Sequence, residues 1–255
     1  MSEVTAPQPP ATGAEAVAAL ADRWCQVVAT SLDLPRPVGP ISLALHRRPG
    51  VARVQGTTIH LFQGLTGEPD TAQLAHELVH LVAGPSPSRF LGEGLAVHIA
   101  ACVDLAEPCW PCYGAHPDDW VAALLERRVP EAVSRLMTTA ESVRLGKPDL
   151  TAGEFLLGWR LYLVAGSFTG HLFRTLEREL FWSGYRRGAC WESQARLADL
   201  EQRWQASVTS AAAGAHDRLS GALRQAGQQM DLLPWDATPA PARPADGESA
   251  TDAAS

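Results

Sequence analysis

Residues 75–100 read AHELVHLVAGPSPSRFLGEGLAVHIA, a largely apolar stretch that contains two glutamates and three histidines. Its first part is an apolar run typical of a helix that ends at Gly84-Pro85. A second apolar run, from Phe90 to Val103, follows after a short connection rich in proline and serine. Two helices joined so tightly are expected to pack antiparallel. The few ionisable side chains inside them are costly to bury unless they are paired or bind a metal.

The first helix contains His76-Glu77-Leu78-Val79-His80, which fits the pattern H-E-x-x-H. Side chains four residues apart lie on one face of a helix, about 5–6 Å apart at Cβ, so that two imidazoles can share one Zn²⁺. Glu77 directly follows the first histidine, where a carboxylate can take a proton from a zinc-activated water. We therefore expect His76 and His80 to bind Zn²⁺ and Glu77 to act as the general base.

Glu93 is expected to supply a third ligand from the second helix. His80 lies four residues before the turn and Glu93 lies four residues after Arg89, where the second helix begins. At about 1.5 Å per residue the two positions return to the same level of an antiparallel pair. Gly92 and Gly94 flank Glu93, which indicates a close approach of backbones there, since glycine weakens a helix. Three protein ligands leave a fourth zinc position open, as in catalytic sites.

HELVH followed by FLGEGLAVHIA resembles the gluzincin metallopeptidases, especially the peptidase MA-like group, in which an E-G-L/F-A stretch carries the third ligand. YLVAGSFTGHLFRTLEREL, residues 162–180, is similar to a later helix of that group. The resemblance implies a zincin-like domain, zinc-dependent hydrolysis of a peptide or protein substrate, and a sheet edge that pairs with extended substrate. By the same resemblance Tyr162 stabilises the oxyanion. If Tyr162 does not, we expect His171 or Tyr185 to donate to it. We expect the edge strand to be TTIHLF, residues 57–62.

One feature of the group is missing here. Val97 stands where related enzymes have an aspartate that supports the zinc ligands. The second ring N–H of a metal-bound histidine usually needs a partner. A backbone carbonyl, Asp104 or Glu154 could serve, and the sequence does not distinguish among them.

The chain as a whole is predicted to be an α+β protein, with a small N-terminal sheet followed by a mostly helical part. We expect a disordered segment over residues 1–13, one domain over 14–230, and a disordered acidic tail rich in proline and alanine over 231–255. Strands are expected at 41–47, 51–55 and 57–62. Helices are expected at about 14–31, 71–83, 89–103, 117–128, 130–137, 153–181 (broken near Gly166) and 191–229.

The charge and the composition of the chain argue against some classes of function. A net charge of −7, without clustered lysine and arginine, argues against nucleic-acid binding. Arg186 and Arg187 stand among aromatic residues, but a contact of these side chains with nucleic acid or with a peptide carboxylate has no support from the net charge. The sequence shows no signal peptide and no run of apolar residues long enough for a membrane span, so we expect a cytoplasmic protein. It leaves the oligomeric state open.

A second group of metal-ligand residue types follows the second helix. Cys102, Cys109, Cys112 and His116 have the spacing C-x6-C-x2-C-x3-H, whose later part is zinc-like. A structural zinc, a redox pair at Cys109 and Cys112, or simple thiols remain alternatives. We interpret His98 as a core histidine, because it lies on another helix face than Glu93.

Three functions stay open after the sequence. Beside a metallopeptidase, the chain could be a non-catalytic protein of metallopeptidase fold that binds or regulates a partner, or a zinc hydrolase of a non-peptide amide. His60 is a further candidate, as a substrate contact on a strand beside the site.

Overall fold

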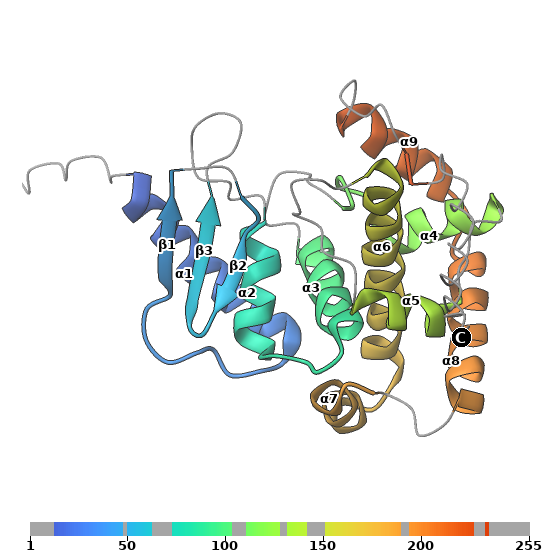
Figure 1. Cartoon of the computed structure of the whole chain (residues 1–255), viewed down its shortest axis with the longest axis horizontal. Helices are drawn as coiled ribbons and strands as arrows, with labels where there is room; N and C mark the ends of the chain where they lie inside the picture. The colour runs from blue at the N-terminus through green and yellow to red at the C-terminus, as the bar shows by residue number, and fades with distance from the viewer. Residues whose placement is uncertain are drawn as a thin grey trace, which may run out of the picture.

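The computed structural model of the chain describes residues 13–47, 50–62, 73–103, 111–127, 132–141, 151–189, 194–226 and 233–234. These residues form a small sheet and a larger set of helices, which makes the protein α+β as the sequence predicts (Figure 1). The strands are β1 (Ser42–His46), β2 (Arg53–Gln55) and β3 (Thr58–Phe62). The helices are α1 (Gly13–Leu32), α2 (Leu74–Ala83), α3 (Arg89–Val103), α4 (Pro117–Glu126), α5 (Val133–Ala140), α6 (Ala152–Thr175), α7 (Arg178–Arg187), α8 (Gln194–Ser210) and α9 (Ala215–Ala226).

The sheet has the strand order β1-β3-β2, with β1 parallel to β3 and β2 antiparallel to it. The turn between β2 and β3 passes through Gly56 at φ +62°, which glycine adopts without strain. The prediction that residues 57–62 form the edge strand is wrong, because β3 pairs on both sides. Within the described residues, β2 is the edge strand next to α2, which packs against both β2 and β3.

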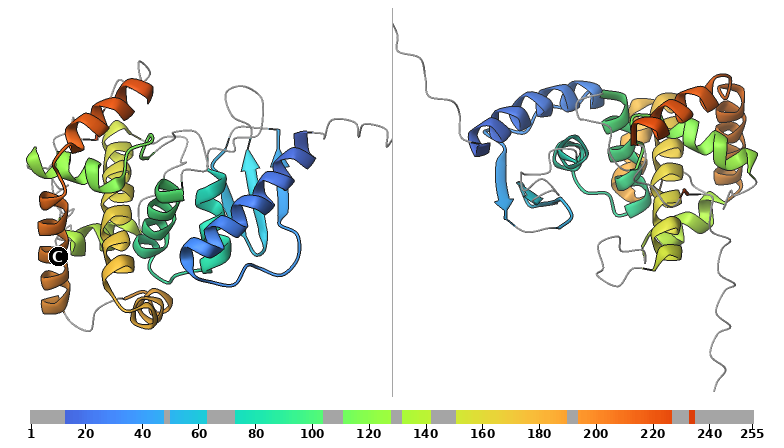
Figure 2. Two further views of the ribbon diagram at one scale, coloured as in Figure 1. Left: turned by 180° about the vertical axis from the view of Figure 1, so that it is seen from behind. Right: turned by 90° about the horizontal axis from the view of Figure 1, so that it is seen from above.

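Helix α1 crosses the back of the sheet and packs on α2 (Figure 2, left). Its buried residues recur every three or four positions, and Trp24 and Val28 lie on this inner face. From β3, Ile59 and Leu61 are fully buried. The sheet therefore buries one face against helices, and this layer holds α2 in place beside α3.

Helices α3 and α6 make the most extensive packing contact of the fold, with α6 between α3 and the C-terminal helices (Figure 1). Two glycines permit this approach. A Cβ at Gly94 would lie 2.4 Å from the carbonyl oxygen of Ala165, and a Cβ at Gly166 would lie 2.6 Å from Cγ1 of Val97. The expectation of close backbones thus holds at Gly94, whose neighbour is α6.

The predicted helix break near Gly166 is wrong. Gly166 lies inside α6, where its lack of a side chain makes room for α3. The chain leaves the helix instead at Leu176 and Glu177, whose extended backbone separates α6 from α7. The helix predicted over 191–229 is two helices, α8 and α9, with Gly214 at φ +75° between them.

The predicted terminal segments lie almost wholly outside the described residues. Of the tail, the structure describes Leu233 and Pro234, and Pro234 is buried with its carbonyl accepting a hydrogen bond from Nε of Arg160. Among the described helices, none combines the length and the apolar character needed to cross a bilayer.

Candidate metal centre

Helices α2 and α3 bring His76, His80 and Glu93 together. Nε2 of His76 lies 3.1 Å from Oε2 of Glu93, and Nε2 of His80 lies 3.5 Å from the same oxygen. The two imidazole nitrogens are 3.2 Å apart, and the rings meet edge to face at 76°. Gly84, at φ +74°, ends α2 and lets the chain return to α3.

These three atoms have the spacing of zinc ligands. Tetrahedral Zn²⁺ with ligand bonds of 2.0–2.1 Å places neighbouring ligand atoms about 3.3 Å apart. The observed separations of 3.1, 3.2 and 3.5 Å lie around that value. Two imidazoles and one carboxylate are also the ligand types of known catalytic zinc sites. The residues therefore fit Zn²⁺ without rearrangement of the helices.

Glu77 lies beside this group and is buried, with a relative exposure of 4%. Burial raises the pKa of its carboxyl, while His76, His80 and the backbone N–H of Val54 partly oppose the rise. The hydrogen bond from Val54 comes from the edge strand β2. The glutamate between the two histidines is therefore held between the helix and the edge of the sheet.

Arg89 holds the side of Glu93 that faces away from the histidines. Its Nε lies 3.5 Å from Oε1 of Glu93, one helical turn away. Burial opposes ionisation of Glu93, but the hydrogen bonds of His76 and His80 outweigh it and hold its pKa well below the usual range. Burial also opposes the positive charge on His80, yet its pKa is raised because Glu93 lies beside it. Glu93 thus offers one oxygen to the histidines and the other to Arg89.

Tyr162, on α6, reaches the same group. Its hydroxyl accepts a hydrogen bond from Nη2 of Arg89 at 3.4 Å, and its ring faces that of His76 with centroids 6.4 Å apart. Burial and the neighbouring Glu93 raise the pKa of the phenol, so Tyr162 stays protonated and able to donate.

The two alternatives to Tyr162 lie elsewhere. The hydroxyl of Tyr185 donates to the carbonyl of Gly84 at 3.1 Å, and its own carbonyl accepts from Ser86, so Tyr185 secures the connection between α2 and α3. His171 is more than two helical turns along α6 from Tyr162 and interacts electrostatically with Arg174 and Asp118.

The side chains beside the three candidate ligands differ from the partners that the sequence suggested. Glu154 forms a capping box with Thr151 at the start of α6 and is exposed, so it does not support the histidines. Asp104 lies outside the described residues. Arg89 was missed, although its position four residues before Glu93 on one helix could have indicated the pair.

His60 does not join the group. Its Nδ1 lies 2.9 Å from Nε2 of His46, and the two rings stack. Because side chains alternate along a strand, His60 lies on the opposite face of the sheet from the buried Ile59 and Leu61.

A second group forms around the far end of α3, with a membership different from that expected. Cys102 and His116 come together with His98, which the sequence indicated only as a core residue. Cys109 lies outside the described residues, and the structure does not bring Cys112 into the group. His98 is 3% exposed, and burial, with the neighbouring Arg174 and His116, lowers its pKa to about 3.

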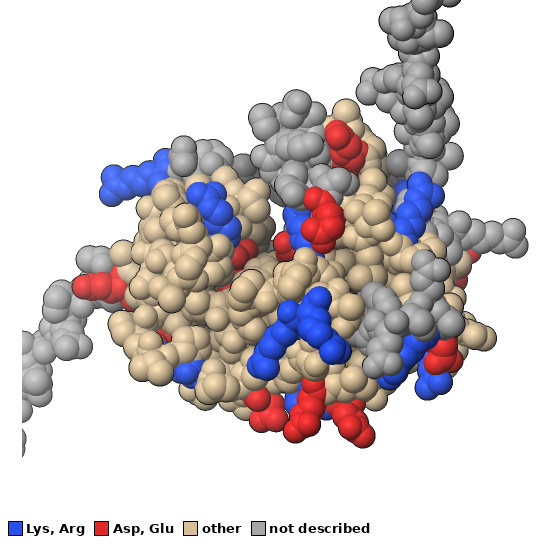
Figure 3. Space-filling view, turned by 60° about the horizontal axis from the view of Figure 1, so that its bottom comes forward, with Lys and Arg blue, Asp and Glu red and all other residues tan. Residues whose placement is uncertain are grey.

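On the face that contains α7, basic side chains lie together near the middle and acidic side chains lie along the lower edge (Figure 3). A shallow pocket there is lined by both signs of charge, together with an aromatic ring: Arg178, Glu179, Trp182, Ser183, Arg186 and Arg187.

Comparison with known proteins gives no family. The sequence matches no family model, no curated protein and no solved structure. The gluzincin resemblance therefore stays an expectation that rests on residues 76–98 and 162–176.

Proposed function

We propose that the protein is a zinc-dependent metallopeptidase with a zincin-like active site. The observation that supports this most is the spacing of the three candidate ligand atoms, 3.1 to 3.5 Å, around one point between α2 and α3. His76, His80 and Glu93 would hold the metal. Zn²⁺ bound there would lower the pKa of a water toward about 7 and polarise a carbonyl group.

The other residues supply the proton transfers and the orientation of the substrate. Glu77 takes the proton from the attacking water and returns it to the leaving amine. Its contact with Val54 ties it to the edge strand β2. An extended peptide that pairs with β2 would pass beside Glu77, because strand addition aligns a backbone along a sheet edge. The substrate strand is thus proposed at β2 and no longer at β3.

Tyr162 is proposed to donate to the oxyanion that develops on the attacked carbonyl. Replacing Tyr162 by phenylalanine is expected to lower kcat about 10²–10³-fold, the usual effect of losing one such donor. KM and zinc content should change little, because the ring that faces His76 remains. Steady-state kinetics on a cleaved peptide will measure this. Tyr113→Phe, in the segment before α4, is the matched control, and an equal loss of kcat in both variants would contradict a specific role for Tyr162.

Metal content tests the proposed site directly. A Glu93→Ala variant is expected to bind one zinc equivalent fewer per chain than the unchanged protein, because the carboxylate that faces both histidines is removed. Inductively coupled plasma mass spectrometry on protein prepared without chelators measures the number. Glu126→Ala, at the exposed end of α4, is the control and should keep its zinc. An unchanged zinc content in Glu93→Ala would count against the ligand set.

Two other functions share part of this site. A zinc hydrolase of a non-peptide amide would use the same ligands and base, and a screen of peptide libraries beside small amides separates the two. A non-catalytic binding protein would keep its partner affinity in Glu77→Gln and show no turnover in either form. A cytoplasmic location stays a prediction from the sequence.

A further inference from the structure

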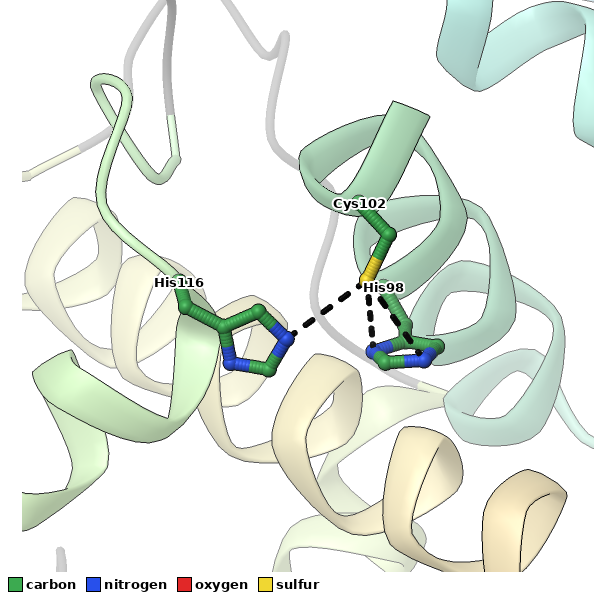
Figure 4. A group of neighbouring side chains, drawn as sticks. All are labelled: His98, Cys102 and His116. Carbon is green, nitrogen blue, oxygen red and sulfur yellow. Dashed lines mark hydrogen bonds between the residues drawn. The ribbon is translucent and has the colours of Figure 1, made fainter. Parts of the chain in front are cut away.

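His98, Cys102 and His116 form a compact group of side chains between the last part of α3 and the start of α4 (Figure 4). His98 and Cys102 are one helical turn apart on α3, so they share a face of that helix. His116 is the residue that caps the start of α4. Residues 18 positions apart in sequence thus meet between two helices.

The cap of α4 aims the His116 ring at Cys102. Nδ1 of His116 accepts a hydrogen bond from the backbone N–H of Asp118 at 3.2 Å. This bond turns the other nitrogen, Nε2, toward Sγ of Cys102, which lies 3.6 Å away. Pro117 at the first helical position fixes the backbone at this point. The direction of the ring is therefore set by the local fold.

The His98 ring is positioned from the other side by α6. A Cβ at Gly170 would lie 2.3 Å from Nδ1 of His98, so only glycine leaves room for the imidazole. Sγ of Cys102 lies 3.8 Å from both ring nitrogens. The sulfur therefore lies off the in-plane direction of either nitrogen, and a metal shared by the two residues would require a rotation of the His98 or Cys102 side chain.

We propose that His98, Cys102 and His116 form a second metal site, which binds Zn²⁺ independently of the first and links α3 to α4. Zinc bonds of about 2.3 Å to sulfur and 2.0–2.1 Å to nitrogen place a thiolate about 3.5 Å from an imidazole nitrogen in a tetrahedral site. The observed separations of 3.6 and 3.8 Å are close to this value. Cys102 is exposed, which gives a metal access from solvent.

Two charged residues, Asp118 and Arg174, lie beside the group and would change its affinity for a metal. When Nε2 of His116 binds a metal, Nδ1 carries the ring proton and gives up the bond from the backbone N–H of Asp118. Oδ2 of Asp118 lies 3.4 Å from Nδ1 and can accept a hydrogen bond from it in this state. Nη1 of Arg174 lies 3.4 Å from Nε2 of His98, and its other amino group pairs with Asp118 at 3.2 Å. The guanidinium opposes a bound cation, but its side chain is 41% exposed and can move toward solvent.

Cobalt substitution distinguishes this site from the first one. Co²⁺ in place of Zn²⁺ gives an ultraviolet charge-transfer band when a thiolate is a ligand, and the first site contains no sulfur. Titration with Co²⁺ is expected to complete this band by two equivalents in the unchanged chain, where both sites compete for the metal, and at one equivalent in Glu93→Ala. Cys102→Ser should lose the band, and Cys109→Ser, the matched control, should keep it. Absence of the band in the unchanged chain, or its persistence in Cys102→Ser, would overturn the proposal.

Two variants that leave all three proposed ligands intact test the geometry. Gly170→Ala should weaken cobalt binding, because the new methyl group displaces the His98 ring. Arg174→Met should strengthen it on the order of tenfold, since it removes a nearby positive charge. Weaker binding in Arg174→Met, or unchanged binding in Gly170→Ala, would contradict this placement of the metal. None of these readouts depends on peptidase activity, so the two sites can fail separately.

Discussion

Glu77→Gln is expected to lower kcat for peptide hydrolysis about 10²–10⁴-fold, the range that a positioned general base contributes. Glutamine has the same size and still offers an oxygen to the N–H of Val54, but it cannot take a proton from water at neutral pH. The zinc content and the unfolding temperature should stay as they are, because His76, His80 and Glu93 are untouched. Peptide turnover, metal analysis and thermal unfolding on one preparation test all three expectations.

The control for Glu77→Gln is Glu126→Gln, the same chemical change at an exposed position on α4. It should leave turnover unchanged. Full activity in Glu77→Gln would contradict the role of Glu77 as base. Loss of zinc together with activity would assign Glu77 to the metal instead, which its burial beside the edge strand does not favour.

Much of the first site could be predicted because it depends on local geometry. The spacing of His76 and His80 follows from the helical repeat alone. The level of Glu93 follows from the rise per residue and a connection too short to allow other arrangements. The structure accordingly brings the three side chains together. Their roles as ligands and the role of Glu77 stay predictions.

The strand order could not be predicted in this way. The strands were recognisable as short apolar segments separated by Pro49-Gly50 and Gly56, but which strand lies at the edge depends on pairing between segments distant in sequence. β1 pairs in parallel with β3, although β2 lies between them in the sequence. This pairing places TTIHLF in the middle of the sheet. The break at Leu176 and Glu177 has no glycine or proline to indicate it, whereas Gly166 resembled a break and serves close packing.

The second cluster, formed by His98, Cys102 and His116, could not be predicted from the sequence either. The cysteine spacing drew attention to Cys109 and Cys112, because short repeats are visible in a sequence. The contact between His98 and His116 depends on how α4 packs beside α3 and α6, and no local pattern indicates it. Gly170 is the one signal that could have suggested a bulky neighbour on α6, but its partner could not be inferred.

The largest expected effect on stability comes from Gly94→Ala. A Cβ at this position would lie 2.4 Å from the carbonyl oxygen of Ala165 and 2.4 Å from Oγ1 of Thr169. The first of these atoms belongs to the backbone of α6, which is packed on both sides and cannot yield. Overpacking of this kind costs about 3 kcal/mol, of which the better helix propensity of alanine returns about 1 kcal/mol. The free energy of unfolding should therefore fall by about 2 kcal/mol.

Gly92→Ala, two residues earlier on the same helix, separates steric overlap from helix propensity. A Cβ there would meet only Cβ of Ser86 at 3.8 Å and the hydroxyl of Tyr185 at 4.0 Å, which are ordinary contacts. This variant should gain up to about 1 kcal/mol, so the two alanine variants are expected to differ by about 3 kcal/mol in urea unfolding of the metal-free chain. Equal stability would mean that α3 and α6 are not as close as described. Because Glu93 lies between the two glycines, displacement of α3 in Gly94→Ala should also weaken zinc binding at the first site, while Gly92→Ala should retain it.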